Sequence, residues 1–554
     1  MPGHDIFLGT TREGNSLYLP EKVRATHMHV LGASGRGKSK FLEHLIREDI
    51  RQERGVLLID PHSFLYDDLV RWIEEKGLFS RRKVILLDPT HDGWTFGFNP
   101  LNFDAPSAYE LDYSVEAMVK ACAQVWGGED MTQTPLLKKV LRSVFYALAS
   151  KRLTLVEALA LTNPEHADAR RYLTSDLSNF VYAEQWQMFN ALGLREFEER
   201  FGSANNRLME FLASEIIRNI IGQQERVMDL RRAMDEGHII LMNLASGGRL
   251  SDDNARLLGA LIVNDLFLKA RRRLKGSRPF YVYIDECARY VNEDIARILD
   301  EARKMGLHLT LAHQHLSQLR EASPAVYSAV MTNAQTKIVF GGLSVEDAEI
   351  MASTVFMGEY KLDEAKYSHD TYAVTDYVRT WLRHYSSTSG FSSGSSSGTS
   401  SSMSMSQADY EGAPVVSSAV WGRSEGSTRG YSESTSQGVS EAFQPVIRKQ
   451  TLPGAFYSLE EQVYRSMALM VTQPTRDAIV KLPAERSCRV TTPEVRDAIP
   501  RDERVHALKE RAHEANPFAS RTDDVRKTLE ERRHALFREA REVSRPKTPR
   551  KFRE

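Results

Sequence analysis

Eight consecutive residues, Gly-Ala-Ser-Gly-Arg-Gly-Lys-Ser from Gly32 to Ser39, have the types and spacing that bind phosphate groups. They follow the apolar run HMHVL and precede FLEHLIREDI, whose apolar residues recur at helical spacing. Glycines let backbone N–H groups surround a phosphate, Lys38 can reach the β and γ oxygens, and Ser39 can bind Mg²⁺. A turn that only joins strand to helix is the alternative. We expect an ATP-binding loop of Gly32, Ala33, Ser34, Gly35, Arg36, Gly37, Lys38, Ser39 and Lys40.

Such a loop needs an acidic partner at the end of a buried strand, and FYVYIDE supplies two carboxylates. Asp285 is expected to bind Mg²⁺ together with Ser39, and Glu286 is expected to activate the attacking water as a general base. Asp60 in VLLIDPH and Asp88 in VILLDP each lack the second carboxylate. Those two residues are interpreted as strand-end turn residues near the nucleotide.

An amide side chain and an arginine complete the candidate catalytic set. Gln314 ends the apolar run LHLTLAHQ, and an amide there can sense the γ-phosphate through the attacking water. Its alternative is an ordinary strand-end residue. Arg303, Arg256 and Arg320 are candidates for a charge offered to the γ-phosphate of a neighbouring subunit, with Arg303 ranked first.

The patterns around these residues predict an α/β fold that an all-helical segment interrupts. Apolar runs that end in Gly, Pro or Asp alternate with amphipathic stretches in the first part of the chain, whereas the next part has long helical periodicity. After the Ser-rich segment, SLEEQVYRSMALMVTQPTRDAIVKL predicts a helix and a strand that return to the core. The predicted organisation is a nucleotide-binding core (1–107 and 235–382), an all-helical insertion (108–234), a Ser/Gly-rich flexible insertion (383–445), a return to the core (446–498) and a charged helical tail (499–554).

The Ser-rich insertion has two possible structures. Of the 21 residues from 386 to 406, 13 are Ser, so the segment can bury little apolar surface and a flexible excursion is favoured. Ser and Thr also alternate with other residues on both sides of APVVSSAVW, so a long polar β-hairpin is the alternative. In the tail, Val525, Leu529, Leu536, Ala540 and Val543 form a narrow helical stripe, and the final RPKTPRKFRE is basic.

Composition limits the classes of protein that this chain can belong to. The 554 residues carry 73 basic and 74 acidic side chains, so any contact with DNA must come from local patches. Three cysteines without metal-ligand spacing argue against a disulfide framework or a zinc site. No stretch has the roughly 20 apolar residues needed to cross a bilayer, so we expect a cytoplasmic protein without direct membrane insertion.

In this order the motifs resemble the HerA–FtsK superfamily of ring ATPases, and within it the TraG-type coupling proteins of conjugative DNA transfer, a type IV secretion process. The matching elements are HMHVLGASGRGKS, VLLIDPH, VILLDPT with FNPLN, MDLRRAMDEGHIILMNLASG, NARLLGALI, YIDECARY, EARKMGLHLTLAHQHLSQL and TNAQTKIVF. The resemblance implies a RecA-like P-loop NTPase core with a projecting helical domain, ATP and Mg²⁺ as cofactors, and a homohexamer around DNA. It carries the family's motif residues onto Lys38, Ser39, Asp285, Glu286 and Gln314, and it leaves the arginine open.

The chain departs from this family because it lacks the usual transmembrane helices. A soluble relative is therefore expected, which would act with a relaxase, a nuclease or a secretion-channel component. The leading hypothesis is an ATP-driven DNA translocase. The alternatives are an ATPase for protein secretion or assembly, and a nucleotide-controlled switch with slow hydrolysis.

Overall fold

The structure is a computed structural model that describes residues 5–103, 107–127, 135–291, 299, 301, 303–361, 363–390, 399–406, 418–425 and 432–544. It divides into two compact units. One comprises Met1–Glu359 with Val463–Glu554, and the other comprises Tyr360–Gln462. No helix in the described part of the chain is both long and apolar enough to cross a membrane.

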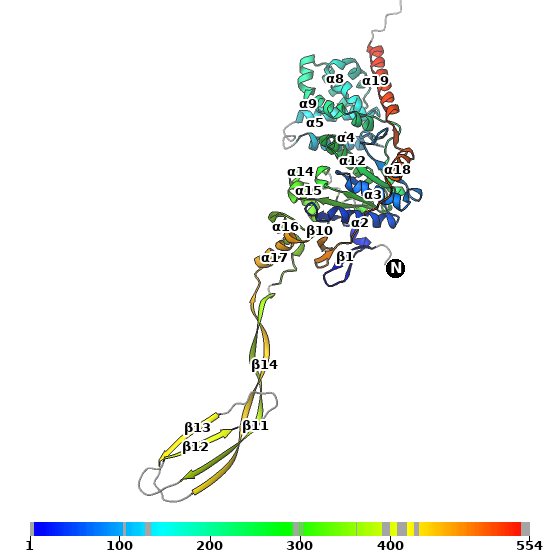
Figure 1. Ribbon diagram of the computed structural model, residues 1–554. Helices are drawn as coiled ribbons and strands as arrows, with labels where there is room; N and C mark the ends of the chain where they lie inside the picture. Colours follow the sequence, from blue (N-terminus) through cyan, green and yellow to red (C-terminus); the bar gives the residue numbers. More distant parts are fainter. Residues whose placement is uncertain are drawn as a thin grey trace, which may run out of the picture. The chain divides into compact units, whose positions relative to one another are not determined.

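The larger unit is built on an 11-stranded sheet whose middle is parallel (Figure 1). Apolar residues fill these middle strands almost without interruption because both faces of the sheet are covered. The parallel strands, in spatial order, are β10 (Thr336–Phe340), β3 (Met28–Leu31), β9 (Leu307–His313), β8 (Phe280–Ile284), β4 (Gly55–Asp60), β7 (Ile239–Asn243) and β5 (Val84–Leu87). Every strand predicted from the apolar runs is present, which confirms the predicted α/β class.

Antiparallel strands extend the sheet beyond β10. Their order is β15 (Asp477–Lys481), β16 (Cys488–Thr491), β1 (Ile6–Thr11) and β2 (Ser16–Leu19). The short helix α1 (Glu21–Arg24) then leads into β3. β15 and β16 follow the Ser-rich part of the chain in the sequence, and both are strands of this sheet.

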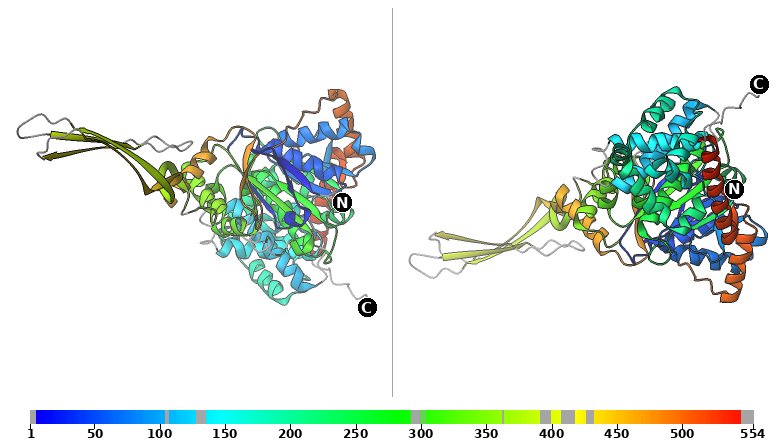
Figure 2. Two further views of the ribbon diagram at one scale, coloured as in Figure 1. Left: turned by 90° about the horizontal axis from the view of Figure 1, so that it is seen from below. Right: turned by 90° about the horizontal axis from the view of Figure 1, so that it is seen from above.

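Helices cover both faces of the parallel strands (Figure 2). Val56 and Leu58 of β4 pack among residues of α2 (Lys38–Arg51), α3 (Phe64–Glu75) and α18 (Asp502–Glu514). Leu57 and Ile59 alternate with them and pack on the other side, where α12 (Asp252–Ala270) lies. A smaller cluster joins Leu31 to α16 (Val345–Phe356) and to the end of α17 (Leu459–Thr472).

The expected helical insertion forms helices whose apolar residues continue the core on the α12 side of the sheet. Its helices are α4 (Ala108–Gly127), α5 (Pro135–Ser150), α6 (Ala158–Thr162), α7 (Ala167–Leu173), α8 (Phe180–Asn190), α9 (Leu194–Ala213), α10 (Glu215–Ile221) and α11 (Leu230–Glu236).

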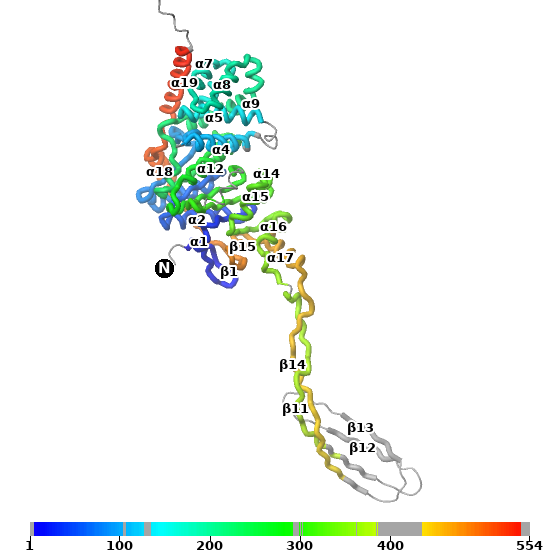
Figure 3. The backbone as a smooth tube through the Cα atoms, turned by 180° about the vertical axis from the view of Figure 1, so that it is seen from behind, coloured from blue at the N-terminus to red at the C-terminus, as the bar shows by residue number. Residues whose placement is uncertain are grey.

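The charged segment after residue 499 is packed rather than free. β17 (Ala519–Arg521) pairs with β6 (Trp94–Phe96), and α19 (Thr522–Ser544) packs along α7 (Figure 3). Ala540 of the predicted apolar stripe is buried, whereas Val543 is exposed. The basic end of the chain, 545–554, lies outside the described residues.

The smaller unit differs from the expected flexible insertion at 383–445. β11 (Ala365–Gly390) pairs along its whole length with β14 (Ser432–Phe456). β12 (Thr399–Ser406) and β13 (Ser418–Glu425) extend the sheet in the order β13-β12-β11-β14. The described residues of this range therefore form strands, as in the hairpin alternative, whereas 391–398, 407–417 and 426–431, with most of APVVSSAVW, lie outside the described residues. Thr, Tyr, Val and Trp favour strands, and the ladder of backbone hydrogen bonds does not depend on a buried core.

Candidate phosphate-binding site

The predicted phosphate loop joins β3 to α2, as the sequence pattern requires. Gly35 and Gly37 adopt φ values of +75° and +103°, a region that favours glycine. A Cβ added at Gly32 would lie 2.5 Å from the Cβ of Phe340, whereas one added at Gly35 would meet nothing within 4 Å. The loop is therefore held tightly at its first glycine and open at Gly35. The first backbone N–H groups of α2 lack partners within the helix, so the loop fits an anion.

Two segments from elsewhere in the chain support this loop. The N–H of Ala33 donates to the carbonyl of Gly341 at 3.2 Å, and the N–H of Arg476 donates to the carbonyl of Arg36 at 3.0 Å. The sequence analysis did not identify these supports. For the bond between Ala33 and Gly341, the sequence does contain a signal, which is the pair of adjacent glycines after β10. Gly342 has a φ of +80°, and a Cβ added there would lie 2.8 Å from the Cβ of Ala33.

The structure brings Lys38 together with both carboxylates of the acidic pair. The Lys38 Nζ lies 3.1 Å from Glu286 Oε1 and 3.9 Å from Asp285 Oδ1. All three residues are at least 94% buried. A cation and two anions thus converge at one place between the start of α2 and the end of β8.

Gln314 joins the same cluster. β9 lies between β3 and β8, so its carboxyl end opens between the phosphate loop and the acidic pair. The Gln314 Nε2 donates to Glu286 Oε1 at 2.8 Å, the same oxygen that Lys38 contacts. Its backbone N–H donates to the Gln318 side chain at the start of α14 (Leu316–Ala322), which is followed by α15 (Pro324–Asn333).

Glu286 is held in a backbone conformation that is unusual for its type. Its φ of 47° and ψ of 50° place it in the left-handed region, which costs a non-glycine residue on the order of 1–3 kcal/mol. The N–H of Glu286 donates to Asp285 Oδ1 at 3.1 Å, and this bond keeps the two carboxylates in a defined relation. Strained residues of this kind concentrate at functional sites.

Burial changes the acidity of the aspartates at this edge of the sheet. Burial raises the pKa of Asp285, an effect that Lys38 opposes and Glu286 reinforces. Burial also raises the pKa of Asp60 to about 6, although the backbone N–H groups of Tyr66 and His62 donate to its carboxylate. Asp88 accepts from Thr90 and from Asn243 at the end of β7. Asp60 and Asp88 thus organise strand-end turns, as predicted.

Ser39 and Asp285 are the side chains present that could hold a Mg²⁺ ion. Ser39 is the second residue of α2 and is exposed, while Asp285 follows β8. A hydroxyl and a carboxylate fit this ion, which keeps most of its other ligands as water or phosphate oxygens. Across the described residues, no group of three or more His, Cys, Asp or Glu side chains could hold a metal ion.

The structure places the other candidate residues away from this cluster. Arg303 is exposed just before β9, at the opposite end of that strand from Gln314. Arg320 pairs with Glu346, and Arg256 is exposed on α12. The Lys40 ammonium contacts Glu43, Asp68 and Asp497 and so points toward an acidic group beside the loop.

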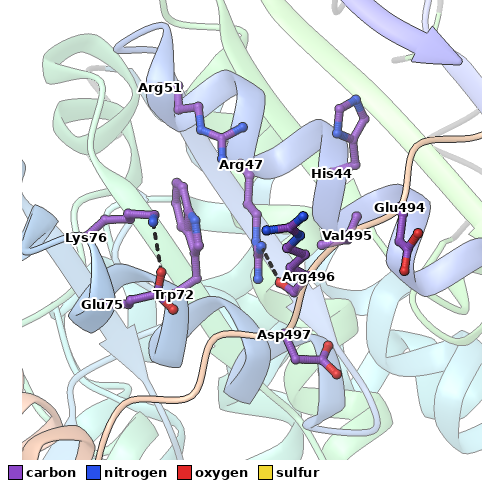
Figure 4. A pocket seen from close by; sticks show the side chains of 10 residues that line it. All are labelled: His44, Arg47, Arg51, Trp72, Glu75, Lys76, Glu494, Val495, Arg496 and Asp497. Carbon is purple, nitrogen blue, oxygen red and sulfur yellow. Dashed lines mark hydrogen bonds and ion pairs between the residues drawn. The ribbon is translucent and has the colours of Figure 1, made fainter.

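A cavity of about 430 Å³ lies on the outer side of α2 (Figure 4). Basic and acidic side chains both line it, and Arg47 donates to the backbone carbonyl of Arg496 across it. Lys76 pairs with Glu75 at its edge. Besides His44, the lining has four basic residues (Arg47, Arg51, Lys76 and Arg496) and three acidic ones (Glu75, Glu494 and Asp497), so it lacks the strong excess of positive charge that would favour a phosphate group.

The parallel sheet, the glycine loop and the facing acidic pair define an α/β protein of the phosphate-binding-loop class. A family model described as the TraM recognition site of TraD and TraG matches residues 279–418, and this match supports the resemblance to TraG-type coupling proteins. No curated protein sequence matches the chain.

Solved structures with a similar arrangement have low sequence identity to this chain. An unbound form of the bacterial conjugative coupling protein TrwBdeltaN70 has a TM-score of 0.49 at 14% identity, covering 89% of this chain and 90% of that one. The plasmid coupling protein TrwB in complex with ADP and Mg²⁺ has a TM-score of 0.47 at 14% identity, with coverage of 89% and 90%. VirB4 of Thermoanaerobacter pseudethanolicus has a TM-score of 0.42 at 14% identity, with coverage of 64% and 88%.

Proposed function

We propose that the chain hydrolyses ATP and uses the energy to move DNA as a ring-forming motor of the conjugative-transfer type. The proposal rests on a cluster of contacts shorter than 4 Å at the end of the phosphate loop. In this cluster Lys38 contacts Asp285 and Glu286, and Gln314 contacts Glu286. A loop that only joined strand to helix would have no reason to face two buried carboxylates and an amide.

Each side chain has a role that its position supports. Lys38 binds the β- and γ-phosphate oxygens, and Glu286 accepts a proton from the attacking water. Gln314 orients the Glu286 carboxylate through the bond to Oε1. Ser39 and Asp285 would hold Mg²⁺, which neutralises charge on the phosphates when bound.

Coupling to movement is supported by the link between Gln314 and the next helices. The backbone of Gln314 is tied to Gln318, so a change at the γ-phosphate is transmitted to α14 and α15. We infer that these helices move with the hydrolysis cycle and act on DNA. The family model spans residues 279–418, which include this link, and its description concerns TraD and TraG. Partners of this motor would include a relaxase, a nuclease or a secretion-channel component.

The test is ATP turnover by the purified chain with and without single-stranded and double-stranded DNA. A DNA motor should turn over faster with one of these DNAs, and Lys38→Ala should abolish turnover in both conditions. Lys22→Ala, which changes an exposed lysine on α1, is the matched control and should leave turnover unchanged.

Two outcomes would reject the proposal in favour of another function. Turnover that ignores both DNAs would indicate a motor for polypeptides. Turnover that stays below about one per minute with DNA, far from the usual enzyme range, would indicate a nucleotide-controlled switch.

A further inference from the structure

The ribbon formed by β11 and β14 has one apolar face that no other described residues of the chain cover. Along β14, every second side chain from Val439 to Ile447 lies on the same side of the ribbon, and its partners on β11 share that side. The large apolar residues of this aromatic face are Tyr372, Val374, Tyr377, Trp381 and Tyr385 on β11, and Val439, Phe443 and Ile447 on β14. Each of them is at least 50% exposed.

A β-bulge in β11 places these side chains on the same side of the ribbon. Val374 pairs with Ile447 and Asp376 pairs with Val446, so Thr375 is an extra residue in β11. Without it, Tyr377, Trp381 and Tyr385 would lie on the face opposite to Tyr372. The bulge therefore collects the aromatic side chains of β11 on one side of the ribbon.

The area of this face is large for a surface that stays in water. The five aromatic side chains are 57–74% exposed and together present roughly 600 Å². That value alone reaches the upper end of the largest apolar patch on a typical monomer, about 300–600 Å². Two such faces together would bury roughly 1,200 Å² from the aromatic rings, which is within the range of stable protein interfaces.

Charges on the aromatic face are nearly balanced and largely paired. Lys449 contacts Asp370 at 2.7 Å, and Arg379 pairs with Glu441. Arg383 adds one further positive charge on this side. Because most charges on this face are paired with one another, the face attracts a polyanion only weakly. It is complementary to another apolar surface whose charges are also balanced.

We propose that the aromatic face packs against the same face of a second copy of this chain. A two-stranded ribbon is marginally stable by itself in water and gains stability when another layer covers its apolar side. A two-fold axis brings the same face of both copies together, so the aromatic rows of the two copies lie opposite each other. This self-association goes beyond the proposed motor function and does not depend on ATP.

The test is sedimentation equilibrium of the full-length chain without nucleotide. Replacing Tyr377, Trp381 and Phe443 together by Ser should weaken self-association at least about 100-fold, as expected when three central aromatic residues of an interface are lost. The matched control replaces Val378, Leu382 and Val446 by Ser, which lie on the opposite face of the ribbon in neighbouring rungs. This control should change the association constant by less than about threefold. Circular dichroism checks that both variants keep their secondary structure.

Several results would overturn this proposal. Equal loss of association in both triple variants, or no loss in either, would mean that the aromatic face does not join copies. Binding of the unaltered chain, but not of the aromatic-face variant, to phosphatidylethanolamine–phosphatidylglycerol vesicles or to a thymidine oligonucleotide would assign the face to a membrane or a nucleic acid instead. Lys38→Ala separates this proposal from the motor function, because it should abolish ATP turnover and leave self-association intact.

Discussion

The buried ion pair between Lys38 and Glu286 predicts two effects of Glu286→Gln, one on nucleotide binding and one on turnover. Lys38 must leave this pair to reach a phosphate group, since its Nζ lies 3.1 Å from Glu286 Oε1 and both side chains are almost fully buried. Losing one partner of a buried pair costs about 3–5 kcal/mol. In Glu286→Gln, Lys38 keeps Asp285 at 3.9 Å, so we expect part of this energy, about 1.4 kcal/mol, to appear as stronger nucleotide binding.

The expected result is therefore an ATP Kd about tenfold tighter together with turnover at least about 100-fold slower. The first effect comes from the released Lys38, and the second from the lost general base. Titration with a fluorescent ATP analogue measures the Kd, and phosphate release measures the turnover.

Glu74→Gln is the matched control. Glu74 is also buried and accepts a bond from Arg504 at 2.9 Å, but it lies on α3 away from the phosphate loop. Glu74→Gln removes the same charge as Glu286→Gln and should change neither the ATP Kd nor the turnover. A Kd that stays constant or weakens in Glu286→Gln would refute the competition between Glu286 and phosphate for Lys38, and normal turnover would refute the base assignment.

Four further predictions test the site and the fold. Gln314→Ala should slow turnover at least about tenfold with little change in the ATP Kd, because Gln314 contacts Glu286 and not the loop; an equal loss of binding would contradict this. Gly37→Ala should weaken nucleotide binding at least about tenfold, because φ is +103° and Arg476 lies 3.3 Å from the added Cβ, whereas Gly14→Ala, at φ +85° in open space, should not. Mixing Arg303→Ala with Glu286→Gln subunits should restore some turnover if Arg303 acts on a neighbouring subunit, and no recovery would count against that role. Burial lowers the pKa of His313 and of His513 to about 4 from 6.5. As the pH falls, these histidines therefore bind protons in the unfolded chain at a higher pH than in the folded chain. The stability present above pH 6.5 should be lost progressively between pH 6.5 and about 4, partly offset by Asp60, and the urea midpoint should fall in that window; a constant midpoint would contradict the burial of neutral histidines.

Much of the core was predictable from the sequence because its signals are local. Apolar runs such as VLLID and FYVYID are buried on both faces of a parallel sheet, so their length and composition identify them as strands. The glycines of the phosphate loop adopt conformations that few other residues tolerate, so their spacing identifies the loop. The placement of Asp285, Glu286 and Gln314 at strand ends follows from the same pattern.

The order of strands, the supports of the loop and the structure of the ribbon depended on contacts between distant parts of the chain. Gln314 reaches Glu286 because β9 lies between β3 and β8, and Arg476 supports the loop from more than 400 positions away. Composition alone favoured flexibility for the Ser-rich segment, since Ser buries little apolar surface, whereas the ladder between β11 and β14 is formed by backbone groups that every residue carries. The sequence by itself determined which residues could bind phosphate, and the tertiary structure decided which of them meet, because strand order is set by packing across the whole sheet.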